Sequence, residues 1–193
     1  MSGKKVLLIV GDFAEDYEVM SCFQALQMLN FHVDAVCPNK AAGERVITAV
    51  HDFTGEQTYS EKVGHFFTLN QAFTAVNPAE YAALLIPGGR APEYLRMNAE
   101  VVALVKHFVD TRKPIAAICH GIQLLAAVEG AVRGKSVTAY PACKVETVLA
   151  GGNFVDCPLD QAVVDGNLVT APAWPGIPAF MREFVKLLGV VIA

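Results

Sequence analysis

The sequence predicts an α/β fold of the doubly wound, flavodoxin-like type, in which helices cover both faces of a mostly parallel sheet. Short, continuously apolar runs alternate along the chain with longer stretches of helical periodicity. The connections between these segments are short, which is typical of alternating strands and helices in one sheet. Of the 193 residues, 53% are apolar and 18% are charged, so the chain has enough apolar surface to bury a sheet on both sides.

Apolar runs of four or five residues are expected to form the buried strands. Parallel strands that are covered on both faces carry such uninterrupted runs, whereas half-exposed strands alternate apolar and polar residues. The expected strands are 6–10, 33–37, 83–86, 115–118 and the shorter 136–139. Two further strands, 161–164 and 168–170, are expected to form a hairpin around the turn Asp165-Gly166.

Stretches between these strands have the spacing of amphipathic helices. In 13–29, apolar side chains recur at intervals of three and four residues, which places them on one helical face. The expected helices are 13–29, 101–109, 122–128, 144–149 and 180–188. Asn30 and Gly189 directly follow the first and the last of these helices, where residues of these two types commonly end a helix.

Residues 43–70 depart from the alternation of strand and helix. This segment is rich in threonine, histidine and aromatic residues, and it has no helical period. We therefore expect a strand-rich insertion at about 43–70, arranged as a hairpin over the active-site edge of the sheet. Internal repeats and flexible linkers are missing from the sequence, so 1–193 is expected to be a single domain.

The charge balance argues against several classes of protein. Fifteen basic and nineteen acidic side chains give a net charge of −4, so neither nucleic acid nor an anionic membrane is an expected partner. No apolar run reaches the ~18 residues of a membrane span. The five-residue run at 6–10 is too short for a signal peptide, so a cytoplasmic protein is expected. The small charged fraction favours a homo-oligomer.

Five cysteines are spread along the chain without metal-binding or redox spacing. There is no C-x-x-C pair, no P-loop and no G-x-G-x-x-G fingerprint, so neither a metal nor a cofactor is expected. Four of the cysteines are expected to be ordinary thiols without a catalytic role: Cys22, Cys37, Cys143 and Cys157. The fifth, Cys119, stands in a different context.

Cys119 directly follows an apolar strand and begins the sequence Cys119-His120-Gly121, which leads into a helix. This is the cysteine counterpart of the G-x-S-x-G serine elbow, a turn that exposes the nucleophile at the ligand-binding edge of an α/β sheet. The helix N-terminus would stabilise a thiolate. Backbone N–H groups of the elbow, including Gly121, and of Gly88 and Gly89 after the preceding strand could hold an oxyanion.

Three motifs, in the order found here, resemble the PfpI/ThiJ superfamily, whose fold is of the class I glutamine amidotransferase type. They are Glu15-Asp16-Tyr17-Glu18, Ile86-Pro87-Gly88-Gly89-Arg90-Ala91-Pro92-Glu93 and Ala117-Ile118-Cys119-His120-Gly121. The resemblance covers nearly the whole chain. The insertion, with its stretches 49–53 and 64–70, is most similar to that of plant-type members with glyoxalase and deglycase activity.

The resemblance implies that Cys119 is the nucleophile and that Glu18 contacts its sulfur. An ionised carboxylate beside a thiolate would raise the pKa of both groups. Glu18 would therefore be protonated, donate a hydrogen bond to the sulfur and serve as the proton carrier. Glu15 and Asp16 are better suited to complement the dipole of the helix that follows them.

In PfpI-type peptidases, a glutamate of the second motif is contributed across a subunit interface, and Glu93 matches it. It would orient His120 as base or electrostatic partner, so that activity would depend on a dimer, trimer or hexamer. Arg90 would either bind a carboxylate product or bridge to an acid. His51 and His65 are candidates for lining the pocket.

One loop departs from the family pattern. Trp174-Pro175-Gly176 stands where many relatives have His-Pro-Gly-Asp, so this chain lacks that histidine and that aspartate.

Three functions are compatible with these residues. The leading one is a glutathione-independent glyoxalase or deglycase, which would convert a small dicarbonyl such as methylglyoxal, or a glycated substrate, through a Cys119 hemithioacetal to a 2-hydroxy acid. The second is an intracellular cysteine peptidase that uses Cys119, His120 and Glu93 across an interface. The third is a non-enzymatic redox sensor that is oxidised at Cys119.

Overall fold

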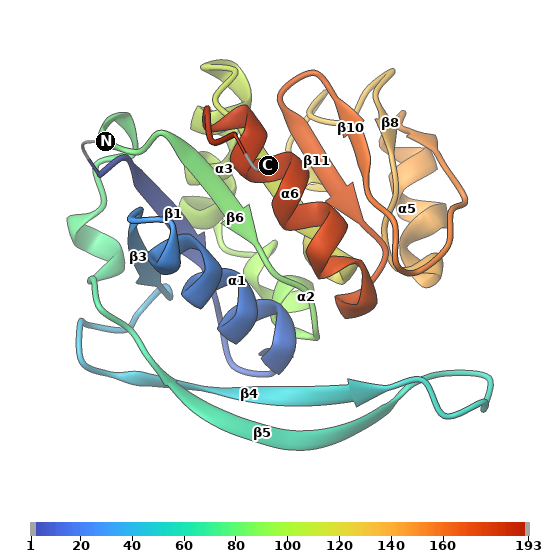
Figure 1. Ribbon diagram of the computed structural model, residues 1–193, viewed down its shortest axis with the longest axis horizontal. Helices are drawn as coiled ribbons and strands as arrows, with labels where there is room; N and C mark the ends of the chain where they lie inside the picture. Colours follow the sequence, from blue (N-terminus) through green and yellow to red (C-terminus); the bar gives the residue numbers. More distant parts are fainter. Residues whose placement is uncertain (1–2, 192–193) are drawn as a thin grey trace.

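A six-stranded sheet runs through the centre of the computed structural model, which describes residues 3–191 (Figure 1). Its strands, in spatial order, are β10 (Val163–Asp165), β11 (Leu168–Ala171), β7 (Ile115–Ile118), β6 (Ala83–Ile86), β1 (Lys5–Ile9) and β3 (His32–Val36). Neighbouring strands are parallel except for β10, which pairs antiparallel with β11. The predicted doubly wound, mostly parallel architecture is confirmed.

Helices cover both faces of this sheet. On one face, α1 (Asp16–Met28) and α6 (Ile177–Leu187) pack side by side (Figure 1). The other face is covered by α3 (Ala99–Asp110) and α4 (Ile122–Ala126), and the short helices α2 (Ala91–Leu95) and α5 (Lys144–Leu149) pack against α4. No helix within residues 3–191 is both long and apolar enough to cross a bilayer.

Single 3-10 turns connect several of these elements. They are η1 (Phe73–Ala75), η2 (Pro78–Glu80), η3 (Cys119–Gly121), η4 (Pro141–Cys143) and η5 (Trp174–Gly176). A small parallel pair, β8 (Ser136–Val137) and β9 (Asn153–Phe154), lies outside the main sheet. The strand expected at 136–139 is therefore shorter than predicted and belongs to this second sheet.

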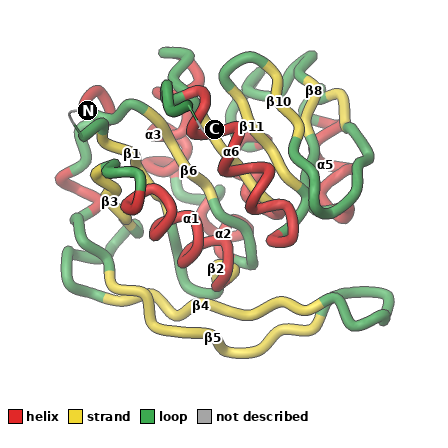
Figure 2. Tube along the Cα trace, in the orientation of Figure 1, coloured by secondary structure: helices red, strands yellow, loops and turns green. Residues whose placement is uncertain are grey.

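The strand-rich insertion is confirmed as a hairpin of β4 (Arg45–Asp52) and β5 (Ser60–Thr68). The short strand β2 (Ala14–Glu15) pairs with β4 and makes a separate three-stranded sheet with the order β2-β4-β5. Figure 2 shows that the hairpin lies across one end of the molecule, and the arrows of Figure 1 show that the parallel strands point toward that end. It therefore covers the edge at which ligands of α/β sheets bind.

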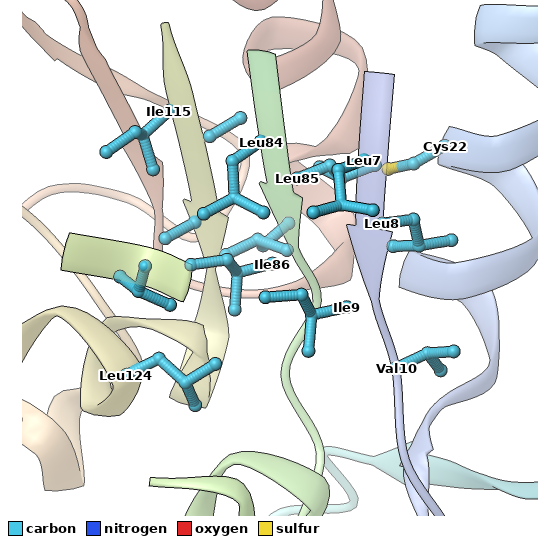
Figure 3. Close-up of a cluster of buried hydrophobic side chains, with 14 of the residues drawn as sticks. Leu7, Leu8, Ile9, Val10, Cys22, Leu84, Leu85, Ile86, Ile115 and Leu124 are labelled. Carbon is cyan, nitrogen blue, oxygen red and sulfur yellow. The ribbon is translucent and has the colours of Figure 1, made fainter. Parts of the chain in front are cut away.

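The apolar strand runs form the core between the helical layers. Leu7, Leu84 and Leu85 are fully buried, and Cys22 points from α1 toward them (Figure 3). Burial of each such leucine contributes roughly 2 kcal/mol, which explains why the apolar runs locate these strands so directly.

Two boundaries differ from the prediction for reasons outside the local sequence. The helix expected at 13–29 begins only at Asp16, because Ala14 and Glu15 pair with β4. The hairpin turn consists of Gly166 and Asn167 rather than Asp165-Gly166, since Asp165 still pairs with Leu168. Gly166 has φ of 61°, a conformation that glycine adopts without steric cost.

Candidate active site

Cys119 is the first residue after β7 and adopts φ of 58°, in the left-handed region. Residues other than glycine rarely adopt this conformation, and it is typical of functional turns held in place by their surroundings. The chain then turns through η3 into α4. The Cys119 side chain lies at the carboxyl end of β7, beneath the hairpin.

Two glycines allow this close packing. A side-chain carbon at Gly88 would lie 2.6 Å from the Cys119 Cβ and 2.8 Å from Glu18 Oε2. At Gly121 it would lie 2.5 Å from the carbonyl oxygen of Ile86. All three distances are shorter than those that real Cβ atoms make, so Gly88 and Gly121 let the two strand ends and α1 converge on the sulfur.

Glu18, from the first turn of α1, is fully buried. Its Oε2 accepts a hydrogen bond from the Gly88 N–H at 2.6 Å. Burial raises the pKa of Glu18 well above its usual value, and the nearby charge of Glu15 raises it further, whereas hydrogen bonds from Gly88 and the Cys119 thiol oppose the shift. The arrangement favours a neutral, protonated Glu18.

The Gly88 N–H is thus occupied by Glu18, and the expectation that it would hold an oxyanion is wrong. The backbone N–H groups of Gly89 and His120 are directed at the Cys119 sulfur instead. Gly121 serves the close packing described above. In the resting site, Gly88 and Gly89 therefore do not form a preformed oxyanion hole.

The Cys119 thiol is buried, with 7% of the residue exposed. Burial raises its pKa, a negative charge on Glu18 would raise it further, and the N–H of Gly89 opposes the shift. The sequence analysis expected a thiolate, but here the loss of hydration outweighs the backbone N–H groups. The resting site holds a thiol beside a neutral acid.

His120 lies next to this thiol, with 3.3 Å between its Nδ1 and the Cys119 Sγ. Burial, and after it the charge of His51, lowers the pKa of His120 to about 4, so the imidazole is neutral at pH 7. A neutral Nδ1 accepts a proton, and the thiol is in position to donate one. The ring is held by stacking on Tyr140, with centroids 4.9 Å apart.

Glu93 lies on α2, exposed to solvent, in a groove that it shares with His120 and Gln123. Within residues 3–191, no hydrogen bond joins Glu93 to His120. The chain by itself therefore does not bring the expected Cys119, His120 and Glu93 into one hydrogen-bonded triad.

Arg90 bridges to an acid, one of the two expected alternatives. Its guanidinium makes two hydrogen bonds to the Glu61 carboxylate, at 2.7 and 2.8 Å, and lies over the Phe13 ring. Glu61 also accepts from His51 Nε2 at 3.0 Å. Arg90 thereby ties the loop after β6 to the hairpin rather than facing the cavity beside Cys119.

A small, enclosed cavity lies above the sulfur. The residues that line it come from β2, the hairpin, the elbow, the loops after β6 and β8, and the loop before α6. They are Glu15, His51, Phe53, Tyr59, Gly89, Cys119, His120, Tyr140 and Trp174. His51 is thus where the sequence predicted it, buried on β4, and its Nδ1 has no partner among the described residues.

The prediction that His65 would line the pocket is wrong. Its side chain is 75% exposed, and its Nδ1 lies 3.1 Å from Asp16 Oδ1. His65 belongs to β5, the outer strand of the small sheet, and faces solvent. The hydroxyl of Thr48 also bonds to Asp16, so Asp16 anchors the hairpin to the start of α1.

Aromatic rings form much of the cavity wall. Phe53 stacks between Tyr140 and Trp174, with centroids 6.0 and 6.1 Å apart. The Trp174 indole N–H donates to the carbonyl of His51 at 2.9 Å, which joins the late loop to the hairpin. Trp174 therefore has a bridging role at the position where many relatives carry histidine. Sequence reasoning missed Phe53 and Tyr140, which only the hairpin's position brings to the site.

Glu15 was also missed as a cavity residue. Its Oε2 accepts from the Tyr17 N–H at 2.9 Å, so it caps α1 as expected of a first-turn acid. However, only 1% of the residue is exposed, and Oε1 has no partner within the part of the chain that the structure describes. Burial raises the pKa of Glu15 to about 7.

The comparisons with known proteins agree with this architecture. A model of the DJ-1/PfpI family matches residues 4–187. Protein DJ-1 homolog D of Arabidopsis thaliana is 51% identical over 193 residues, which are all of this chain and 50% of that protein. Deglycase PH1704 of Pyrococcus horikoshii is 37% identical over 95% of this chain and 99% of its own length.

Among solved structures, DJ-1 of Schizosaccharomyces pombe matches with a TM-score of 0.76 and 19% identity, over 97% of this chain and 92% of that chain, which supports the fold. A two-domain protein of Anabaena variabilis with DJ-1/ThiJ/PfpI-like and ferritin-like domains matches with the same TM-score, 26% identity and coverage of 96% and 48%. The chain spans about half the length of its Arabidopsis relatives. By the match over 4–187 and by these identities, the chain belongs to the DJ-1/PfpI family.

Proposed function

We propose that this chain is a glutathione-independent glyoxalase or deglycase that acts on small dicarbonyls or on early adducts derived from them. One observation carries the proposal: a buried cysteine on a strained elbow pairs with a neutral histidine at the floor of a small cavity. The relatives named deglycases, which match this chain over nearly their whole length, support the same chemistry.

The first step is addition of the Cys119 sulfur to an aldehyde. As the carbon–sulfur bond forms, the thiol proton passes to Nδ1 of His120, 3.3 Å away. The carbonyl oxygen becomes an alkoxide and takes that proton back, which gives a neutral hemithioacetal. Because His120 is neutral at pH 7, it can accept the proton without first losing one.

Two proton transfers complete the reaction. Removal of the proton from the former aldehyde carbon gives an enediol, and protonation of the neighbouring carbon gives a thioester of Cys119. Water then cleaves the thioester, which restores the Cys119 thiol and releases the 2-hydroxy acid. From methylglyoxal, this product is lactate. Glyoxalase and deglycase activities share the hemithioacetal, so one site supports both.

The enclosed cavity favours a small substrate over an extended peptide. A peptidase of the PfpI type would further need Glu93 to reach His120, which it does not within the described chain. A redox sensor needs only the sulfur and Glu18. These two alternatives are outcomes of the same experiment.

The purified protein is incubated with methylglyoxal without glutathione, and lactate is measured. We expect lactate from the wild type and a loss of about a thousandfold or more in Cys119→Ala, because the covalent path disappears. Cys157→Ala is the control, since this half-buried thiol hydrogen-bonds to Thr138 and does not line the cavity, and its activity should stay within about twofold of the wild type.

Absence of lactate from the wild type contradicts the proposal. Cleavage of casein without lactate would favour the peptidase. No turnover, with a gain of two oxygens on Cys119 under mild peroxide, would favour the redox sensor.

A further inference from the structure

The cavity above Cys119 holds a carboxylate oxygen that nothing else in the described chain uses. Glu15 lines this cavity, and 1% of the residue is exposed. Its Oε2 caps α1 through the Tyr17 N–H, whereas Oε1 is buried without a hydrogen-bond partner among residues 3–191. Buried polar atoms nearly always have a partner, so an orphaned oxygen in the cavity beside the nucleophile indicates contact with a bound molecule.

Glu18 is placed differently. It is fully buried, its Oε2 is held by the Gly88 N–H next to Cys119, and its Oε1 also has no hydrogen-bond partner among residues 3–191. It does not belong to the cavity lining. Glu18 can therefore act on the sulfur, but the carbons of a bound substrate would lie on the other side of that sulfur.

We infer that Glu15, rather than Glu18, carries the proton between the two carbons of the hemithioacetal. This inference rests on the proposed function. The Glu15 carboxylate takes the proton from the carbon bonded to sulfur, and the electron pair of that bond forms the double bond of the enediolate. The resulting carboxylic acid returns the proton to the neighbouring carbon, the hydroxyl proton moves to the anionic oxygen of that neighbouring carbon, and the thioester of a 2-hydroxy acid forms with no net change in redox state.

The environment of Glu15 is consistent with a proton carrier. Its pKa is raised to about 7, mainly by burial; the Tyr17 N–H opposes this shift, and a charge on Asp16 contributes to it. A base with a pKa near the working pH combines an available carboxylate with a useful proton affinity. Burial also raises the pKa of Glu18 well above its usual value, which favours a Glu18 that keeps its proton.

Each titratable group around Glu15 has its own partner or a fixed state. Asp16 is bound by Thr48 and His65 and faces the hairpin. On β4, His51 is paired with Glu61 through Nε2. On the elbow, His120 is neutral and Cys119 is a thiol at neutral pH. Glu15 is thus the cavity carboxyl that remains free to exchange a proton with a substrate.

The test compares Glu15→Gln, Glu18→Gln and Asp110→Asn in lactate formation from methylglyoxal and in the intact mass of the protein. Glutamine at position 15 keeps the side-chain oxygen that caps α1 but cannot accept the carbon-bound proton. We expect lactate formation to fall about a hundredfold or more, while Cys119 still forms its adduct at a rate within about threefold of the wild type. The adduct should therefore accumulate on Glu15→Gln.

Glu18→Gln should instead change the rate at which the adduct forms, because this side chain acts on the sulfur. Asp110→Asn is the control, an exposed acid on α3 that pairs with Lys106 and does not line the cavity, and it should stay within about threefold of the wild type in both measurements. Glu15→Asp keeps a carboxylate and should recover part of the lost rate.

Lactate formation by Glu15→Gln within about threefold of the wild type would overturn the inference, as would accumulation of adduct on Glu18→Gln alone. Failure of the proposed function gives a different result. In that case the wild type forms no lactate, or Cys119→Ala forms it as well. If near-ultraviolet circular dichroism shows that Glu15→Gln is unfolded, Glu15→Asp is measured in its place. Adduct formation at the wild-type rate with slowed lactate release supports the inference, and an unchanged rate of lactate release contradicts it.

Discussion

Neighbouring acids at the start of α1 have pKa values displaced in opposite directions. Burial raises that of Glu15 from 4.5 to about 7. For Asp16, burial is outweighed by hydrogen bonds from Thr48 and His65, and its pKa is lowered. The two side chains are adjacent in sequence, so their difference comes from the direction in which each points. Glu15 faces the dry cavity, and Asp16 faces the hairpin.

This difference makes a prediction about stability. Between pH 4.5 and about 7, the folded protein keeps a proton on Glu15 that the unfolded chain has lost. The stability contributed by Glu15 is thus fully present below the unfolded pKa and is lost as the pH rises through 7. Glu15→Gln is neutral at every pH, so its free energy of unfolding should exceed that of the wild type by about 3 kcal/mol at pH 8 and match it near pH 4.

Urea denaturation at the two pH values measures this difference. Asp16→Asn should behave in the opposite way, because a lowered pKa gives stability that is present above the unfolded pKa and lost as the pH falls. It should be less stable than the wild type at pH 8. If Glu15→Gln gains nothing at pH 8 relative to pH 4, Glu15 is not held in a dry environment.

Among the elements, the β4–β5 hairpin contributes most to the site without belonging to the main sheet. Arg90 holds it through Glu61, and Trp174 holds it through the carbonyl of His51. At the end of β4, Phe53 stacks between Tyr140 and Trp174 and closes the cavity above Cys119. The hairpin therefore contributes a wall that restricts substrate size.

Removal of this wall should weaken substrate binding more than chemistry. Phe53→Ala loses two stacked contacts, each worth about 0.5–1.5 kcal/mol. We expect KM for methylglyoxal to rise about tenfold and kcat to change less than about threefold. Phe66→Ala is the control, because this exposed ring lies on the same hairpin against Arg45, away from the cavity. Equal effects of the two substitutions on KM would contradict a specific role for the wall.

The elements that the sequence predicted well are those determined by local composition. The buried strands follow directly from apolar runs such as 83–86 and 115–118, because only a strand covered on both faces carries such a run. The elbow followed from a cysteine between such a strand and a helix. The predictions failed where a segment distant in sequence determines the local structure. The strand β2 forms because β4 lies beside it, and α1 therefore begins later in the sequence than predicted.

The same reason explains what was missed at the site. Phe53, Tyr140 and Glu15 reach the cavity only because the hairpin folds over the sheet edge, and no local pattern specifies that direction. His65 was expected in the pocket, but the outer position of β5 turns it to solvent. Cys119 was expected as a thiolate because its sequence context shows a helix N-terminus but not the loss of water around the sulfur.

At the scale of the whole molecule, Glu93 is the expected site residue that its own chain does not join to His120. It lies in the groove beside His120 without bonding to it, on a helix whose surroundings expose Tyr94 and Met97. Exposed aromatic and methionine side chains are typical of the centres of protein interfaces. We propose that this face meets a second copy of the chain, which brings its own Glu93 to His120 and completes the site.

A shared site of this kind predicts complementation. Suppose that Glu93→Ala and Cys119→Ala are each inactive alone. In a mixed dimer, the Glu93→Ala chain supplies Cys119 and the Cys119→Ala chain supplies Glu93, so one of the two sites is intact. Random co-assembly should restore about a quarter of the wild-type rate of lactate formation, because half of the dimers are mixed and each holds one working site. Co-expression with two affinity tags isolates the mixed species and allows its activity to be measured directly. An isolated mixed dimer without activity would show that each chain completes its own site. A Glu93→Ala protein as active as the wild type would also contradict the shared site, because a residue that completes the site across the interface cannot be dispensable.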